Sequence, residues 1–234
     1  MTDTPTRNPG SLAVSAQGLG CTGMNHGYGT SDDTQSIATL HRALDLGVTP
    51  LDTADFYGAG HNEELIGRAV AGRRDEVVIA TEFGLANRLG EPTLIRGDSA
   101  HVRQACEASL RRLGVDRIDL HSAEGPAETD VRRSRPRFTD GNPERNPAIV
   151  AKPEELASAK GVTTGRPAPA WVRHRGEDVV PVPGTRRQRY PEENLAALDV
   201  ELSPEGLAAV EAAAPVGQVA GTRYDATGPT FVDN

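Results

Sequence analysis

The feature that most restricts the fold is a regular alternation of short apolar runs with amphipathic segments over residues 18–120. The run EVVIATEF is almost continuously apolar, which is typical of a strand in a parallel sheet that is covered on both faces. On either side of it, residues 62–70 and 99–113 have apolar side chains at helical spacing. Strands that alternate with helices in this way form right-handed βαβ units. We therefore expect an α/β fold built on a parallel sheet.

Capping residues mark the ends of the expected helices. Helix N-termini favour Ser, Thr, Asp and Asn, and glycine is common just after a C-terminus. The residues that we expect at the ends of three helices are Ser31 or Asp32, Gly47, Asn62, Ser99 and Gly114. The runs VTPLDTA and RIDL are expected as further strands of the same sheet.

The alternation stops after RIDL. The stretch SAEGPAETDVRRSRPRFTDGNPERNP has no period, which predicts an irregular junction over 122–148 within one domain of residues 1–234. We expect the next helix to begin at Pro153, because proline suits the first helical position. Pro167 and Pro169 should delay the start of the helix after that.

The last part of the chain again has an α/β pattern. VVPVPG reads as a strand, and residues 192–198 and 204–213 read as two closing helices. The chain has 234 residues, which is close to the roughly 250 residues of a single (β/α)8 barrel.

Charge and cysteine content exclude several classes of protein. The net charge of −8 argues against a nucleic-acid or membrane partner, since both need a basic surface. Cys21 and Cys106 lie far apart, so that neither a disulfide framework nor a metal site is expected. The N-terminus lacks the pattern of a signal peptide, and no apolar run is long enough to span a membrane. We expect a cytoplasmic protein.

Four motifs resemble the aldo-keto reductase family in order and spacing. They are GLGCTGM, ALDLGVTPLDTADFYGAGHNEELIGRAV, CEASLRRLGVDRIDL and VVPVPGTRRQRYPEENLAALDVELS. The resemblance implies a (β/α)8 barrel of the TIM type that binds NADP(H) at the C-terminal ends of its strands. It also implies hydride transfer between the nicotinamide and a small carbonyl or alcohol substrate.

The resemblance implies catalytic positions as well. Tyr57 matches the family's proton donor, and Asp52 matches the aspartate that holds a lysine beside it. The lysine position is Glu82, and two carboxylates would raise the pKa of Tyr57, or one of them would take up a proton. His121 is the candidate for the family's histidine. However, it follows Asp119 by two residues, and the alternation along a strand then places it on the opposite side from that histidine.

The adenosine end of the cofactor site is better matched. Guanidinium groups and backbone N–H groups suit the dianionic 2′-phosphate of NADP(H). The cofactor-binding positions implied by the resemblance are Gly20, Cys21, Thr22, Asp52, Gly184, Thr185, Arg186, Arg189, Glu193 and Asn194.

The chain departs from the family in length. It passes from the fourth strand almost directly to the stretch before the last, so strands five to seven have no identifiable counterpart and we expect an incomplete barrel. One expected function is NADPH-dependent reduction of an aldehyde or ketone, with activity impaired by Glu82. The alternative is a non-catalytic remnant with at most weak NADP(H) binding. In a third alternative, two chains complete each other's barrel.

Overall fold

The computed structural model describes residues 4–25, 31–86, 94–123, 136–139, 141–213, 215 and 219–221. Its centre is a four-stranded parallel sheet. The strands, in spatial order, are β3 (Leu19–Gly20), β4 (Pro50–Ala54), β5 (Val78–Phe83) and β8 (Leu120–Ala123). The expected α/β fold with a parallel sheet is confirmed.

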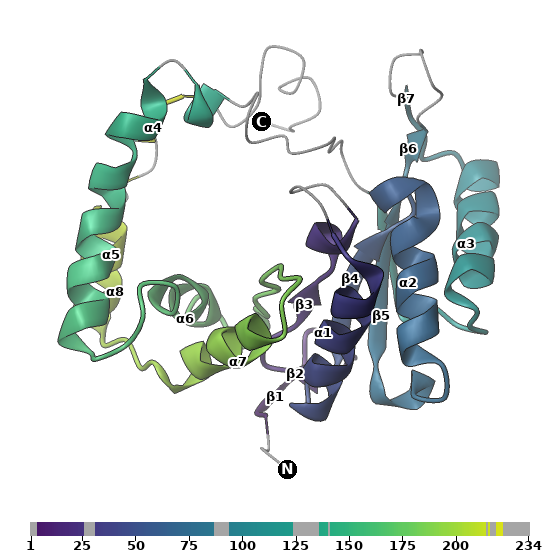
Figure 1. Cartoon of the computed structure of the whole chain (residues 1–234), viewed down its shortest axis with the longest axis horizontal. Helices are drawn as coiled ribbons and strands as arrows, with labels where there is room; N and C mark the ends of the chain where they lie inside the picture. Colours follow the sequence, from purple (N-terminus) through teal and green to yellow (C-terminus); the bar gives the residue numbers. More distant parts are fainter. Residues whose placement is uncertain are drawn as a thin grey trace.

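Three helices cover one face of this sheet (Figure 1). They are α1 (Asp33–Asp45), α2 (His61–Val70) and α3 (Ser99–Leu113). The main apolar core lies between these helices and the strands, and the side chains of Leu40, Leu51, Ile66 and Ile79 are fully buried in it. Burial of this apolar stripe is what holds the first half of the chain together.

The opposite face of the sheet is only partly covered. In β5, Ile79 and Thr81 point to the helices and are fully buried, whereas Ala80 and Glu82 point away and are half-buried. The expectation that this strand is covered on both faces is therefore wrong. The reason is that the strands in the described part of the chain do not close into a barrel.

A segment from the end of the chain lies on the far side of β3. The backbone N–H groups of Gly18 and Gly20 donate to the carbonyls of Pro181 and Pro183 at 2.9 and 3.2 Å. Gly20 also forms a parallel bridge with Gly184. A Cβ atom on Gly20 would lie 3.2 Å from the Cα atom of Gly184, so a larger residue here would push the two segments apart by a few tenths of an ångström. VVPVPG thus pairs as a strand would, next to the first strand of the sheet.

The second half of the chain is helical and extends away from the sheet as an open arc (Figure 1). Its helices are α4 (Asn142–Arg145), α5 (Pro147–Ala159), α6 (Pro167–Arg173), α7 (Arg189–Leu195) and α8 (Pro204–Ala213). A second, small apolar cluster of Ala170, Val200 and Leu202 joins several of them. The two clusters are separate, so much less apolar surface stabilises this half.

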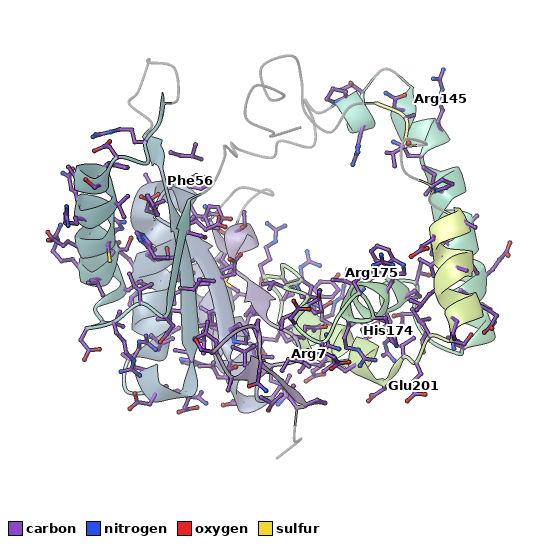
Figure 2. The ribbon with its side chains drawn as sticks, turned by 180° about the vertical axis from the view of Figure 1, so that it is seen from behind. Arg7, Phe56, Arg145, His174, Arg175 and Glu201 are labelled. Carbon is purple, nitrogen blue, oxygen red and sulfur yellow. The ribbon has the colours of Figure 1, made fainter. Side chains whose placement is uncertain are left out.

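Short elements complete the fold. These are β1 (Thr6–Arg7) paired with β2 (Val14–Ser15), β6 (Leu85–Ala86) paired with β7 (Leu94–Ile95), and the 3-10 turns η1 (Thr22–Met24), η2 (Tyr57–Gly60), η3 (Arg74–Glu76), η5 (Pro136–Phe138) and η6 (Ala196–Asp199). Arg7 ties the N-terminal hairpin to the later half, since its guanidinium donates to the carbonyls of Gly176 and Val179 at 2.6 and 2.5 Å (Figure 2).

Two helices begin earlier than the sequence predicts. α5 begins at Pro147 rather than Pro153, and Pro153 lies inside it without a backbone N–H to donate. α6 begins at Pro167, so the expected delay is wrong. Pro167 and Pro169 occupy the first turn, where backbone N–H groups have no partner within the helix. Within the expected junction at 122–148, the described residues include η5 and α4.

The expected caps are confirmed at α1 and at the C-terminus of α3, but the N-cap of α3 is Asp98, with Ser99 as the first helical residue, and the expected cap of α2 is wrong. Asp32 accepts from the backbone N–H of Gln35 at 2.7 Å, and Gly114 ends α3 in the left-handed conformation. The cap of α2 is Gly60, not Asn62. Among the described residues, no helix is long and apolar enough to cross a membrane.

Candidate active site

Two carboxylates lie together on the open face of the sheet. In the register of β4 and β5, Asp52 pairs with Ala80 and Ala54 pairs with Glu82. Paired residues of parallel strands point to the same face, so Asp52 and Glu82 share the open face, one pleat apart on neighbouring strands. Glu82 lies next to the C-terminal end of β5 and Asp52 in the middle of β4; barrel enzymes place their active sites at the C-terminal ends of the strands.

The two acids affect each other's charge. Burial, and next the negative charge of Glu82, raise the pKa of Asp52 to about 6. This is the direction expected for like charges that face each other. The chain's two lysines, Lys152 and Lys160, are carried by α5 and its C-terminal cap, on the far side of the arc from β5 (Figure 1).

Tyr57 follows β4 in the turn that leads into α2. Its side chain is buried, and the ring meets that of Phe56 edge-on, with the centroids 4.8 Å apart. Gly58 and Ala59 both have positive φ, at 59° and 54°. Ala59 is the only residue other than glycine with positive φ in the described part of the chain. A left-handed alanine costs about 1 kcal/mol, so the sharp turn that fixes Tyr57 is held by its surroundings.

His121 lies on the other face of the sheet. It pairs in register with Thr81, and its ring stacks on that of Phe83 with the centroids 4.3 Å apart. Burial lowers the pKa of His121. The open-face position beside Glu82 in this strand is Ser122 instead. The structure therefore separates His121 from Asp52, as the alternation argument predicts.

The loop after β3 touches the same site. The backbone N–H of Cys21 donates to the carbonyl of Asp52 at 2.9 Å, and Gly20 pairs with Asp52. The Cys21 thiol is fully buried, and this burial raises its pKa, so it stays protonated at neutral pH. Thr22 begins η1 and is half-buried.

The predicted adenosine-end residues lie close to this loop. Thr185 is buried, and its backbone N–H donates to the carbonyl of Gly20 at 3.3 Å. Further along, Arg189 and Glu193 line an open hollow of about 520 Å³. Arg186 and Asn194 are half-buried nearby in sequence. The structure thus places Gly184 and Thr185 against Gly20, and it places Arg189 and Glu193 in the lining of one hollow.

A buried polar group behind the sheet was missed by the sequence reasoning. Glu63 is fully buried; it accepts from the Thr81 hydroxyl at 2.7 Å and from Arg112 Nε at 2.6 Å. Asp55 lies nearby, and burial followed by the charge of Glu63 raises its pKa to about 6. The sequence does contain a signal for this buried acid: Glu63 lies three residues before Ile66, on the apolar stripe of α2.

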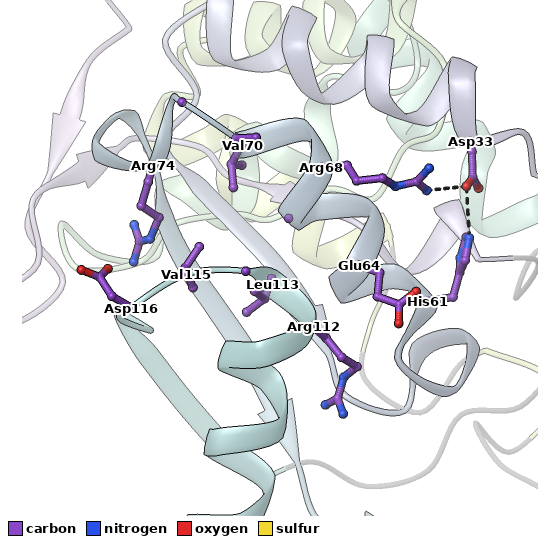
Figure 3. A pocket seen from close by; sticks show the side chains of 14 residues that line it. Asp33, His61, Glu64, Arg68, Val70, Arg74, Arg112, Leu113, Val115 and Asp116 are labelled. Carbon is purple, nitrogen blue, oxygen red and sulfur yellow. Dashed lines mark hydrogen bonds and ion pairs between the residues drawn. The ribbon is translucent and has the colours of Figure 1, made fainter.

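A hollow of about 1020 Å³ lies on the helix side, between α2 and α3 (Figure 3). Several of its charged groups form ion pairs. Asp33 accepts from Arg68 at 2.5 Å and lies 3.2 Å from His61 Nε2, and Arg74 pairs with Asp119. These pairs indicate a solvated surface between helices. Among the described residues, no group of three or more His, Cys, Asp or Glu could hold a metal ion.

The fold and the site define a class of protein. A parallel sheet with an acid pair and a tyrosine near its C-terminal edge is the frame of a (β/α)8-type fold, and in the described part of the chain its strands do not close into a barrel.

Comparisons with known proteins find similarity to one family. Residues 17–131 match the model of the aldo/keto reductase family. The chain is 29% identical to the aldo-keto reductase yakc of Schizosaccharomyces pombe, whose name specifies NADP(+), over 94% of each chain. That alignment runs over 321 residues although this chain has 234, so the relative has internal sequence without a counterpart here. The chain is thus similar to the aldo-keto reductase family over residues 17–131 and to this relative over nearly its whole length.

Solved structures agree on the fold. The glycerol dehydrogenase from Gluconobacter oxydans superposes with a TM-score of 0.72 at 21% identity, covering 90% of this chain and 95% of that one. An aldo-keto reductase from Klebsiella pneumoniae in complex with NADPH superposes with a TM-score of 0.66 at 23% identity, covering 96% and 99%. At such identities the likeness supports the barrel-type fold alone.

Proposed function

We propose that this chain binds NADP(H) and descends from reductases of aldehydes or ketones, with its own hydride-transfer step impaired. The observation that carries the proposal is that Glu82, rather than a cation, shares the open face with Asp52. The relatives named above, one with NADP(+) in its name and one bound to NADPH, support the cofactor.

The impairment has a simple electrostatic cause. Hydride would come from the bound cofactor, and its arrival at a carbonyl carbon leaves charge on the oxygen, which needs a proton. Tyr57 is the proposed donor. A positive neighbour would favour the loss of its proton, whereas the charge of Glu82 opposes it. Positioned acid catalysis is worth about 10²- to 10⁴-fold, so losing it leaves slow turnover at best.

The second candidate function is NADP(H) binding without catalysis. It is favoured by the placement of His121 behind the sheet, stacked on Phe83, where it cannot orient a substrate oxygen beside Tyr57. The proposed cofactor-holding residues of the later segment, Thr185 and Arg189, are common to both functions. Guanidinium and hydroxyl groups of this kind suit the phosphorylated ribose of NADP(H).

The first experiment is a titration of the purified chain with NADPH, followed by cofactor fluorescence and thermal unfolding. Saturable binding with a rising Tm supports the proposed cofactor, because a ligand at 100 times its Kd stabilises the folded state by about 2.7 kcal/mol. No binding and no cooperative transition would refute it.

Catalysis is tested with Glu82→Lys against a panel of aldehydes and ketones, followed by loss of NADPH absorbance. We expect turnover to rise about 100-fold or more, and Tyr57→Phe in the same background to abolish the gain. Glu82→Gln is the matched control, since it removes the anion without adding a cation. If all variants bind NADPH and none turns over, the non-catalytic function stands.

We also infer that the protein works in the cytoplasm. Its two cysteines, Cys21 and Cys106, are free thiols, which suits a reducing compartment. Fractionation of cells that express the full-length chain would test this location.

A further inference from the structure

The hollow near α7 has an arginine and a tyrosine side by side in its lining. It is lined by Thr163, Thr164, Gly165, Arg189, Tyr190 and Glu193. The Arg189 guanidinium carbon lies 4.7 Å from the centroid of the Tyr190 ring, and Arg189 donates to the Tyr190 hydroxyl at 2.7 Å. The hydrogen bond from Arg189, and next the charge of Arg189, lower the pKa of Tyr190. A stacked arginine and tyrosine suit a flat, anionic ligand.

Glu193, the carboxylate in the lining of this hollow, already accepts hydrogen bonds from other residues. Arg166 donates from Nε to Glu193 Oε1 at 3.1 Å and from Nη2 to Oε2 at 3.0 Å. The hydroxyl of Thr163 also donates to Glu193. Both side chains of the ion pair are mostly buried, at 26% and 30% exposed. Arg166, and next Thr163, hold the pKa of Glu193 below its usual range.

The paired hydrogen bonds from Arg166 to Glu193 change the charge that a ligand in the hollow meets. Without Arg166, the hollow would present the Glu193 carboxylate beside Arg189, and the two charges would largely cancel. With Arg166 in place, Glu193 is neutralised and the charge of Arg189 remains available. A ligand with an additional phosphate gains most from this, because the interaction scales with its charge.

We propose that Arg166 is a specificity-determining residue that makes this hollow prefer a 2′-phosphorylated nucleotide over an unphosphorylated one, by neutralising Glu193. The inference rests on the proposed binding of NADP(H), and it assigns the preference for phosphate to a residue outside the family motifs of the sequence. Arg166 acts through Glu193 and the local field, and no contact between Arg166 and the nucleotide is required.

The test measures the Kd of the purified full chain for NADPH and NADH, by cofactor fluorescence, in four variants. Arg166→Gln should lower the preference for NADPH about fivefold, as expected for one charge removed within a Debye length, about 8 Å, of a dianion. Glu193→Gln should raise the preference by a similar factor. The double variant should return to the wild-type preference, and Arg166→Lys should keep most of it. High salt should shrink all these differences.

Three results would overturn the inference. One is an equal loss of NADPH and NADH affinity in Arg166→Gln, which would mean that Arg166 only supports the fold. Another is an unchanged preference. The third is a double variant whose preference for NADPH over NADH is lower than that of both single variants.

Failure of the cofactor proposal is distinguished by repeating the series with 2′,5′-ADP and 5′-AMP, the adenosine half alone. If NADPH does not bind but 2′,5′-ADP binds and loses its advantage in Arg166→Gln, the role of Arg166 stands and the cofactor proposal fails. If neither nucleotide binds wild-type protein, both are refuted.

Discussion

Replacing Arg112 by methionine should destabilise the chain by about 3–5 kcal/mol, because it leaves the buried Glu63 carboxylate without its cation. Arg112 Nε lies 2.6 Å from Glu63 Oε2, and Glu63 is fully buried while Arg112 is 26% exposed. The remaining partner, the Thr81 hydroxyl, supplies one neutral hydrogen bond, which contributes about 0.5–1.5 kcal/mol. Methionine keeps the aliphatic stem that packs over Gly60, so the main change is the loss of charge.

The chain offers a matched control at the surface. Arg117 pairs with Asp75 at 2.5 Å, but these side chains are 48% and 91% exposed. Arg117→Met should cost less than about 1 kcal/mol, because solvent screens such a pair. The two variants remove the same group at a similar distance and differ in burial.

The assay is urea unfolding followed by circular dichroism, with the free energy extrapolated to water. Adding Glu63→Gln to Arg112→Met should recover part of the loss, since no unpaired charge then remains. Native domains are stable by about 5–15 kcal/mol, so the single change removes a large share. Equal losses in Arg112→Met and Arg117→Met would refute the reasoning, because burial would then make no difference.

Other predictions concern pH and helix packing. The pKa of both Asp52 and Asp55 is raised to about 6, so the folded state holds more protons than the unfolded state between about pH 4 and pH 6. The free energy of unfolding should therefore fall as pH rises through this window. Asp52→Asn should make this dependence of the unfolding free energy on pH less steep, as measured by urea titrations at several pH values. An unchanged dependence on pH would contradict the raised pKa of Asp52. Gly67→Ala would place a Cβ 2.3 Å from the carbonyl oxygen of Leu113, and it should cost at least about 1–3 kcal/mol. An unchanged Tm would mean that α2 and α3 do not pack there.

Local features of the fold could be predicted from the sequence because they depend on neighbours along the chain. The cap at Asp32 and the stop at Gly114 are side-chain and backbone effects within one turn of helix. Proline positions were harder to interpret. Pro167 was expected to delay a helix that it begins, because sequence alone does not say whether a proline lies in the first turn or the interior.

The candidate site was predictable in part. The motif order indicated Asp52, Tyr57 and Glu82, and strand alternation correctly separated His121 from them. The ion pair between Arg166 and Glu193 was not foreseen, because the two residues are 27 positions apart in the chain and meet only in the folded structure.

The sequence by itself determined the alternation of strands and helices in the first half of the chain, the parallel sheet and the resemblance to the aldo-keto reductases, since periodicity and motif spacing are written along the chain. Only the tertiary structure decided what each element faces. It left one face of β5 partly open, buried Glu63 against Arg112, and brought residues 181–185 beside β3. The physical reason is that burial and charge pairing depend on contacts between distant segments, and those contacts exist only once the chain is folded.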